Sequence, residues 1–72
     1  MDQQDFHKRV RKTAHDVRTP ITTIAGFADI LAEDPALSED QQEMAATIVV
    51  ETRRLAQMLE SFFAEISPKP EV

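Results

Sequence analysis

Residues 38–66 read SEDQQEMAATIVVETRRLAQMLESFFAEI, and the spacing of the apolar side chains in this stretch decides the fold. Ile48, Leu55 and Phe62 follow one another at intervals of seven residues. A second set keeps the same interval, and its members are Ala45, Thr52, Leu59 and Ile66. Seven residues make about two turns of an α-helix, so the two sets form one stripe with the pattern of an a/d seam. The stretch predicts a long helix over about residues 39–66, with Phe62 on the seam and Phe63 off it.

Local signals mark both ends of this helix. Ser38 and Gln41 have the spacing of a capping box, in which two side chains satisfy free backbone N–H groups of the first turn. The acidic residues that follow Ser38 suit the positive end of the helix dipole. At the other end, the prolines of the segment 67–70 cannot continue a helix. Residues 67–72 are therefore predicted to be a tail or the start of a linker.

A second helix is predicted over about residues 5–32. Apolar residues recur there at helical intervals, at Phe6, Val10, Val17, Ile21, Ile24, Ala28 and Leu31. Pro35 ends this pattern, because proline cannot continue a helix and disfavours helical geometry at the residue before it. Residues 33–38 are then a short loop, and a short loop between two long helices predicts an antiparallel hairpin.

Length and composition suggest how such a hairpin becomes stable. The chain has 72 residues, enough for one small domain over 1–72 but little for a hydrophobic core of its own. It has no cysteine and only two histidines, so disulfides are excluded and a structural zinc site lacks ligands. One hairpin also leaves half of each apolar stripe uncovered. We therefore expect an all-α fold in which two hairpins pair as a homodimeric four-helix bundle.

Charge is unevenly distributed along the chain. The net charge is −5, yet basic residues cluster near the start, at Lys8, Arg9, Arg11, Lys12 and Arg18. An acidic overall field without aromatic residues among the bases argues against nucleic-acid binding, so a phosphate or an acidic protein is the better ligand. No apolar run approaches the roughly 20 residues that span a bilayer. We expect a cytoplasmic location and no membrane contact by this chain.

His15 stands out from the rest of the first predicted helix. On an ideal helix it lies roughly 155° from the centre of the apolar stripe, so it should point to solvent. Its neighbours one helical turn away on either side are Arg11, Lys12, Arg18 and Thr19. These cations suit a phosphoryl group or a docking partner. Pro20 removes a backbone hydrogen bond beside this histidine and predicts a helix kink there.

The segment around His15 also resembles a known family. The run Ala14-His15-Asp16-Val17-Arg18-Thr19-Pro20-Ile21 is similar to the H-box of sensor histidine kinases, with the same residue types in the same order. The downstream run at 24–31 and the segment from Glu51 through Phe62 also resemble the dimerisation and histidine phosphotransfer domain of these kinases. The resemblance covers about residues 5–66.

This resemblance implies a role for each matching residue. His15 would be the phosphoacceptor, which takes the γ-phosphoryl group of ATP and passes it to an aspartate of a response-regulator receiver domain. Asp16 would orient the imidazole and act in proton transfer, and Thr19 would position water for phosphatase activity. For Thr19, a hydroxyl that only bonds to its own helix remains an alternative. ATP and Mg²⁺ would sit on a separate ATP-binding catalytic domain, so this chain alone should need no metal or cofactor and should be inactive.

Two other functions remain open. A non-catalytic helical dimerisation module that docks an acidic partner would explain the seam and the basic cluster, but not the proline five residues after an exposed histidine. A monomeric histidine phosphotransfer domain needs four helices in one chain, whereas the pattern predicts two. The ordered motif around His15 therefore favours the phosphoacceptor domain of a histidine kinase.

Overall fold

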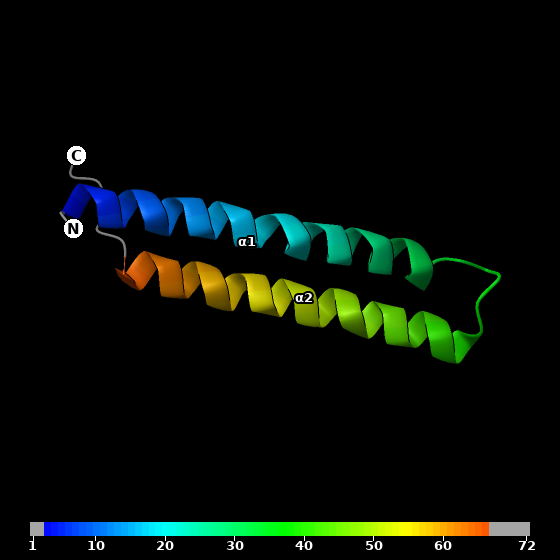
Figure 1. Cartoon of the computed structure of the whole chain (residues 1–72). Coiled ribbons are helices and arrows are strands. Elements are labelled where there is room, and N and C mark those ends of the chain that lie inside the picture. Colours follow the sequence, from blue (N-terminus) through cyan, green and yellow to red (C-terminus); the bar gives the residue numbers. More distant parts are fainter. Residues whose placement is uncertain (1–2, 67–72) are drawn as a thin grey trace.

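The protein is an antiparallel hairpin of two long helices (Figure 1). A computed structural model describes residues 3–66, and within them α1 spans Gln3–Ala32 and α2 spans Glu39–Ile66. Helix α1 begins two residues before its predicted start, and the other three helix ends fall at the predicted residues. The predicted tail at 67–72 lies outside the described residues. The predicted all-α hairpin is confirmed, and within 3–66 neither helix is long and apolar enough to cross a membrane.

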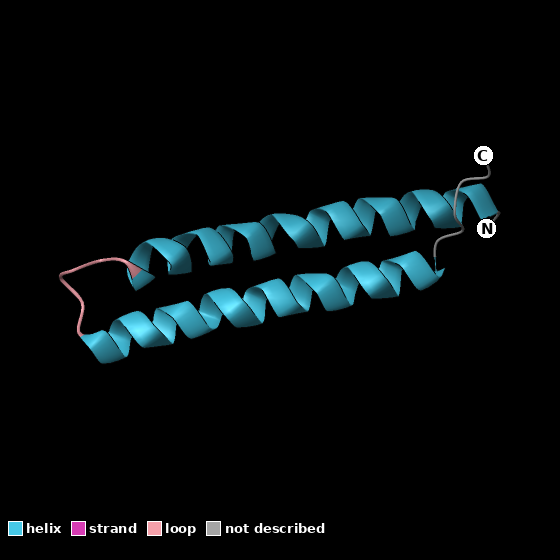
Figure 2. Cartoon of the chain, turned by 180° about the vertical axis from the view of Figure 1, so that it is seen from behind, coloured by secondary structure: helices cyan, strands magenta, loops and turns pink. Residues whose placement is uncertain are grey.

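Hydrogen bonds fix the loop and the start of α2. The capping box is present, because the Ser38 N–H donates to Oε1 of Gln41 at 3.0 Å and the Gln41 N–H donates to Oγ of Ser38 at 3.1 Å. Within the loop, Oδ1 of Asp34 accepts a bond from the Ala36 N–H at 2.9 Å. The Gln42 side chain donates to the Asp34 carbonyl at 2.6 Å, which ties the loop to the first turn of α2. The loop that joins the two helices is pink in Figure 2.

The two helices pack against each other along one line of side chains on each helix. On α2 this inner seam consists of side chains that are buried or half-buried: Ala45, Val49, Thr52, Ala56, Leu59, Phe63 and Ile66. Opposite them, Val10 and Ala28 of α1 are 7% and 4% exposed. Thr52 is buried too, and its hydroxyl donates to the Ile48 carbonyl, so the polar group is satisfied. The core is thin, because no large side chain of the described residues is fully buried.

Within the single hairpin, part of the predicted stripe on α2 stays uncovered, as the sequence led us to expect. Ala45, Thr52, Leu59 and Ile66 do face α1, but Ile48, Leu55 and Phe62 are 46%, 46% and 53% exposed. Together with the exposed Met44 and Met58, those three form a second line, the outer seam, roughly a quarter turn around α2 from the inner seam. Phe63, predicted to lie off the seam, belongs to the inner one. The predicted stripe on α2 therefore comprises two lines of side chains, of which one packs on α1 and the other stays exposed in a single hairpin.

The apolar stripe of α1 divides in the same way. Val10, Val17, Ile21 and Ala28 face α2, whereas Phe6, Ile24 and Leu31 are exposed. Helical periodicity places these exposed residues on the same side of the hairpin as the outer seam of α2. One side of the hairpin is therefore apolar and uncovered, a feature that marks interaction surfaces on soluble proteins.

The capping box yields the first prediction. Replacing Ser38 by Ala leaves the Gln41 N–H without its acceptor and should lower the free energy of unfolding by about 1 kcal/mol. For a domain of this size, that corresponds to a fall of roughly 4–8 °C in the melting temperature measured by circular dichroism. Ser61→Ala is the matched control, because Ser61 is exposed in the interior of α2 and alanine favours a helix there. Equal melting temperatures for the two variants would contradict the cap.

Candidate phosphoacceptor site

His15 lies near the middle of α1 with a side chain that is 78% exposed. On the helix it lies roughly opposite the exposed apolar residues Phe6 and Ile24, so it points away from the uncovered apolar side of the hairpin. The His15 side chain therefore points to solvent, as its position on the helix predicted. The imidazole makes few packing contacts, so reacting groups can reach it from the solvent.

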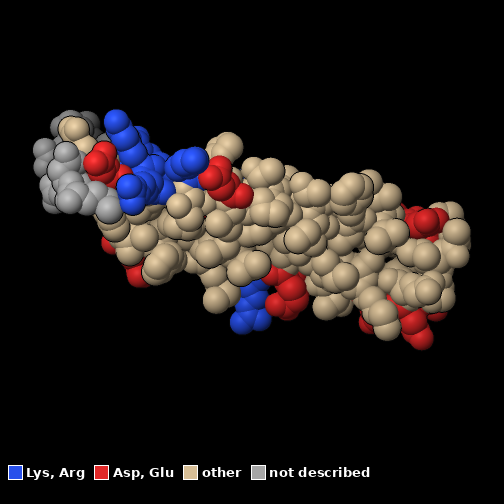
Figure 3. Space-filling model, viewed as in Figure 1, with Lys and Arg blue, Asp and Glu red and all other residues tan. Residues whose placement is uncertain are grey.

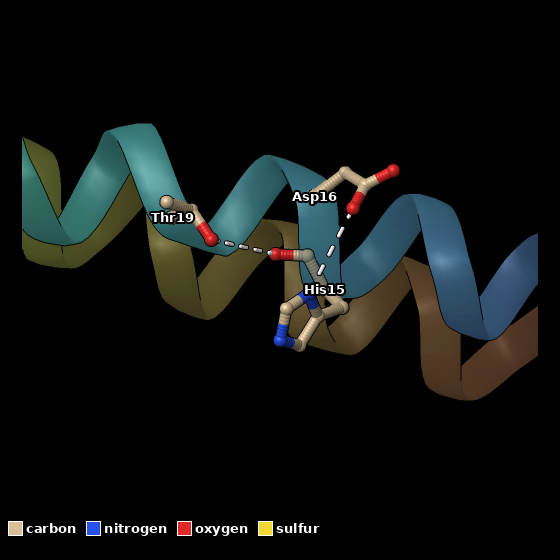
Figure 4. A network of polar contacts seen from close by, with 3 residues as sticks. All are labelled: His15, Asp16 and Thr19. Atoms are coloured by element: carbon tan, nitrogen blue, oxygen red, sulfur yellow. Dashed lines mark hydrogen bonds and ion pairs between the residues drawn. The ribbon is translucent and has the colours of Figure 1, made fainter.

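The neighbouring Asp16 carboxylate turns toward the imidazole. Its Oδ1 lies 3.7 Å from Nδ1 of His15, and the other ring nitrogen, Nε2, points away from the carboxylate (Figure 4). A distance of 3.7 Å exceeds that of a hydrogen bond, so the contact is an ion pair only when the ring is protonated. Adjacent residues on a helix do not normally face each other. Here a side-chain rotation brings them together, as the proposed role of Asp16 requires.

Pro20 does not interrupt α1. The helix runs through it from Gln3 to Ala32, although proline has no N–H to donate to the Asp16 carbonyl. Two threonine hydroxyls bond to carbonyls of the same segment: Oγ1 of Thr19 donates to the His15 carbonyl at 3.3 Å, and Oγ1 of Thr23 donates to the Thr19 carbonyl at 3.1 Å. The Thr19 hydroxyl thus bonds to its own helix, which is the alternative that remained open from the sequence. The kink at Pro20 stays a prediction.

The three basic residues predicted to face a phosphate or a partner differ in their surroundings. Arg18 forms an ion pair with Glu60 of α2, with 3.3 Å between Nη2 and Oε1. Arg11 and Lys12 are exposed one turn before His15, and neither forms an ion pair with a residue that the structure describes. Lys and Arg side chains gather at the end of α1 where the chain begins (Figure 3), and the sequence places Arg11 and Lys12 in that part of the helix.

A shallow surface hollow brings part of the predicted site together. His15, Arg18 and Thr19 line it, along with Thr22 and Thr23. An imidazole, a guanidinium and hydroxyl groups around one hollow can receive a tetrahedral anion such as a phosphoryl group. Within residues 3–66, no group of three or more histidine or acidic side chains is placed to hold a metal ion.

Two residues that line this hollow, and a third that forms an ion pair with Arg18, were not predicted from the sequence. Thr22 and Thr23 follow the recognised motif directly, and helical spacing from His15 and Thr19 is the signal that identifies them. Glu60 gives no such signal, because its contact with Arg18 depends on how far the two helices are shifted along each other. Sequence spacing within one helix does not determine that shift.

A helical hairpin that exposes a histidine beside a carboxylate, a guanidinium and hydroxyl groups suits the class of helical phosphoacceptor domains. The model of the family described as the His Kinase A (phospho-acceptor) domain matches residues 7–68. The chain belongs to this family. Its membership disfavours the alternative of a non-catalytic dimerisation module.

Several curated proteins are similar to the chain. The sensor histidine kinase YcbM of Bacillus subtilis strain 168 is 29% identical over 62 residues, which is 85% of this chain and 20% of the relative. The sensor protein VanSC of Enterococcus gallinarum is 35% identical over 54 residues, 75% of this chain and 15% of the relative. The sensor protein VanS of Enterococcus faecium is 37% identical over 51 residues, 69% of this chain and 13% of the relative.

The chain spans one fifth or less of the length of these three relatives. The matching segment is therefore one part of proteins that contain much more. No solved structure matches the chain significantly.

Proposed function

We propose that the chain is the dimerisation and phosphoacceptor part of a two-component sensor histidine kinase, with His15 as the residue that carries the phosphoryl group. The observation that carries this proposal is the 78% exposure of the His15 side chain within a chain of the His Kinase A family. A phosphoacceptor must reach a nucleotide on one partner and an aspartate on another, and an exposed imidazole opposite the apolar side of the hairpin can meet both.

The chemistry proceeds in two transfers. The lone pair of Nε2 of His15 attacks the γ-phosphorus of ATP, the bond from that phosphorus to the bridging oxygen breaks, and ADP leaves with the electron pair. In the second transfer, a carboxylate oxygen of the receiver aspartate attacks the phosphorus. The N–P bond then breaks, and its electron pair returns to Nε2.

Asp16 supports the first transfer from the other side of the ring. Its carboxylate faces Nδ1, so it favours the tautomer that keeps the proton on Nδ1 and leaves the Nε2 lone pair free. As the ring becomes positive during attack, the carboxylate stabilises it and can take the Nδ1 proton. A small movement that shortens the 3.7 Å contact provides the hydrogen bond this step requires.

Thr19 is proposed to act when the signal is switched off, in phosphatase activity that removes phosphate from the phosphorylated regulator. Its hydroxyl lines the same hollow as His15 and lies one turn further along α1. The hydroxyl donates to the His15 carbonyl but keeps lone pairs that can orient a water molecule for in-line attack on an acyl phosphate.

The remaining partners follow from the same proposal. ATP and Mg²⁺ belong to a separate catalytic domain, where the metal neutralises charge on the phosphates. A response-regulator receiver domain is the second partner, and the cytoplasm is the proposed location. Arg11 and Lys12 are exposed one turn from His15, where they can meet the phosphates of the nucleotide or an acidic partner surface.

We further propose that two hairpins pair through their apolar sides into a four-helix bundle. The outer seam of α2 and the exposed Phe6, Ile24 and Leu31 of α1 would then be covered, while His15 stays accessible. The thin core of a single hairpin supports this pairing, because a domain this small needs further burial to be stable.

Leu55→Asp tests the dimer. Leu55 is 46% exposed in one hairpin, so the substitution should matter little to a monomer. In the bundle it buries an unpaired charge and should cost several kcal/mol, dissociating or unfolding the protein. Val50→Asp is the control, because Val50 is 60% exposed on another face of α2. Sedimentation and melting at several concentrations measure both variants, and a melting temperature independent of concentration would refute the dimer.

His15→Gln tests the phosphoacceptor. Mixed with a histidine-kinase ATP-binding domain of the same system and labelled ATP, the chain should be labelled on His15, and the variant should lose the label. The product should be a phosphoramidate, labile in acid and stable in base. Because the side chain is exposed, stability should change by no more than about 0.5 kcal/mol. Label that persists in His15→Gln, in the presence of an active catalytic domain, would overturn the assignment.

The two neighbouring roles are separated by a pair of variants. Asp16→Asn removes the charge that faces Nδ1 and should slow labelling of His15, by the roughly 10²-fold or more that general acid–base assistance typically supplies. Thr19→Ala should leave labelling largely intact and reduce only the loss of phosphate from a cognate regulator. Labelling rates and regulator dephosphorylation are measured on the same preparations, and the opposite pattern of defects would reverse the two assignments.

A further inference from the structure

Arg18 lies between the hollow at His15 and a groove between the two helices. It lines the hollow that contains His15, and it also lines a groove between the helices with Ala14, Ile21 and Leu59. Its guanidinium spans that groove to Glu60, at 3.3 Å between Nη2 and Oε1. Of the cations one helical turn from His15, Arg18 is the one tied to a carboxylate of the other helix.

This ion pair is weak enough to be exchanged. The Arg18 and Glu60 side chains are 57% and 62% exposed, and exposed ion pairs contribute little to stability. A phosphoryl group on a histidine in the same hollow carries nearly two negative charges and three acceptor oxygens, whereas Glu60 offers a single charge. A guanidinium between the two anions is therefore drawn from the carboxylate to the phosphoryl group.

We propose that Glu60 is a positioning residue that holds Arg18 across the groove until a phosphoryl group arrives on His15, and that phosphorylation transfers Arg18 from Glu60 to the phosphoryl oxygens. The inference rests on the proposed function of His15. It adds a coupling between the two helices, because the ion pair joins α1 to α2 and is lost when His15 is modified.

Thermodynamic linkage makes the coupling measurable from either side. If the phosphoryl group weakens the Arg18–Glu60 pair, the pair must oppose phosphorylation of His15 to the same extent. Removing the charge of Glu60 should then release Arg18 and favour phosphorylation. In the absence of Arg18, the same substitution at Glu60 should have no effect.

Potassium phosphoramidate tests this competition on the 72-residue chain, because it modifies histidine without a kinase. Nε2 of His15 attacks its phosphorus, the P–N bond of the reagent breaks, and ammonia leaves. His7 lies two turns away along α1, so its labelling in the same molecule serves as an internal reference for the reagent. Peptide mass spectrometry gives the ratio of the initial labelling rates of His15 and His7. The anionic phosphoryl oxygens already lie at the hollow in the transition state of this transfer, so a guanidinium released from Glu60 should raise the rate as well as favour the product.

Glu60→Gln should raise this ratio roughly two- to fivefold, the range that corresponds to an exposed ion pair. Glu65→Gln is the matched control, because Glu65 is exposed on the same helix and forms no ion pair with a described residue. It should leave the ratio unchanged. Arg18→Gln should lower the ratio, and adding Glu60→Gln to Arg18→Gln should change it no further.

Two results would overturn the role of Glu60. One is an equal ratio in Glu60→Gln and Glu65→Gln, and the other is a rise of the same size with and without Arg18, which would indicate a purely structural effect. Melting temperatures of all variants show whether the hairpin is intact. Because phosphoramidate supplies the phosphoryl group directly, failure here is distinct from failure of ATP-dependent labelling, which tests the proposed function itself.

Discussion

A two-helix hairpin can bury only one line of side chains on each helix, and the other properties of this protein follow from that constraint. Helix α2 has two apolar lines, the inner seam that packs on α1 and the outer seam headed by Met44 and Ile48. The inner seam uses small residues such as Ala45 and Ala56, which let the helices approach but bury little area. The outer seam carries large side chains such as Ile48, Leu55 and Phe62, so much apolar surface is still exposed in a single hairpin.

The same constraint separates the fold from the chemistry. The outer seam of α2 lies on the same side as the exposed Phe6, Ile24 and Leu31 of α1. The opposite side does not take part in that apolar surface, and it presents His15, Arg18 and Glu60 to solvent. In the proposed dimer, association covers the apolar side and leaves this polar side open. A phosphoacceptor on the buried side would have to unpack the bundle before each transfer, whereas His15 needs no such step.

The sequence was most informative where structure is local. The end of α1, both ends of α2 and the Ser38–Gln41 capping box depend on residues within a few positions of one another, and all were predicted from local signals such as prolines and capping spacing. Placing His15 in solvent needed only the phase of one helix. Which half of the α2 stripe packs on α1 did not follow from the sequence, and Phe63 was placed off the seam, because neighbouring lines of side chains fall within one broad apolar stripe. The Arg18–Glu60 pair was missed for a related reason, since it depends on the register between helices.

The backbone of α1 around His15 lacks one helical hydrogen bond and gains bonds from side chains. Pro20 leaves the Asp16 carbonyl without its helical donor, while the Thr19 hydroxyl adds a bond to the His15 carbonyl beside it. The segment that carries the reactive imidazole is thus held partly by side chains and by the ion pair across the groove, in place of a complete backbone ladder. Side-chain bonds at an exposed site exchange with solvent and ligands more readily than buried backbone bonds do. The proposed transfer of a phosphoryl group to His15 therefore takes place on a part of α1 that exposed side-chain hydrogen bonds help to hold.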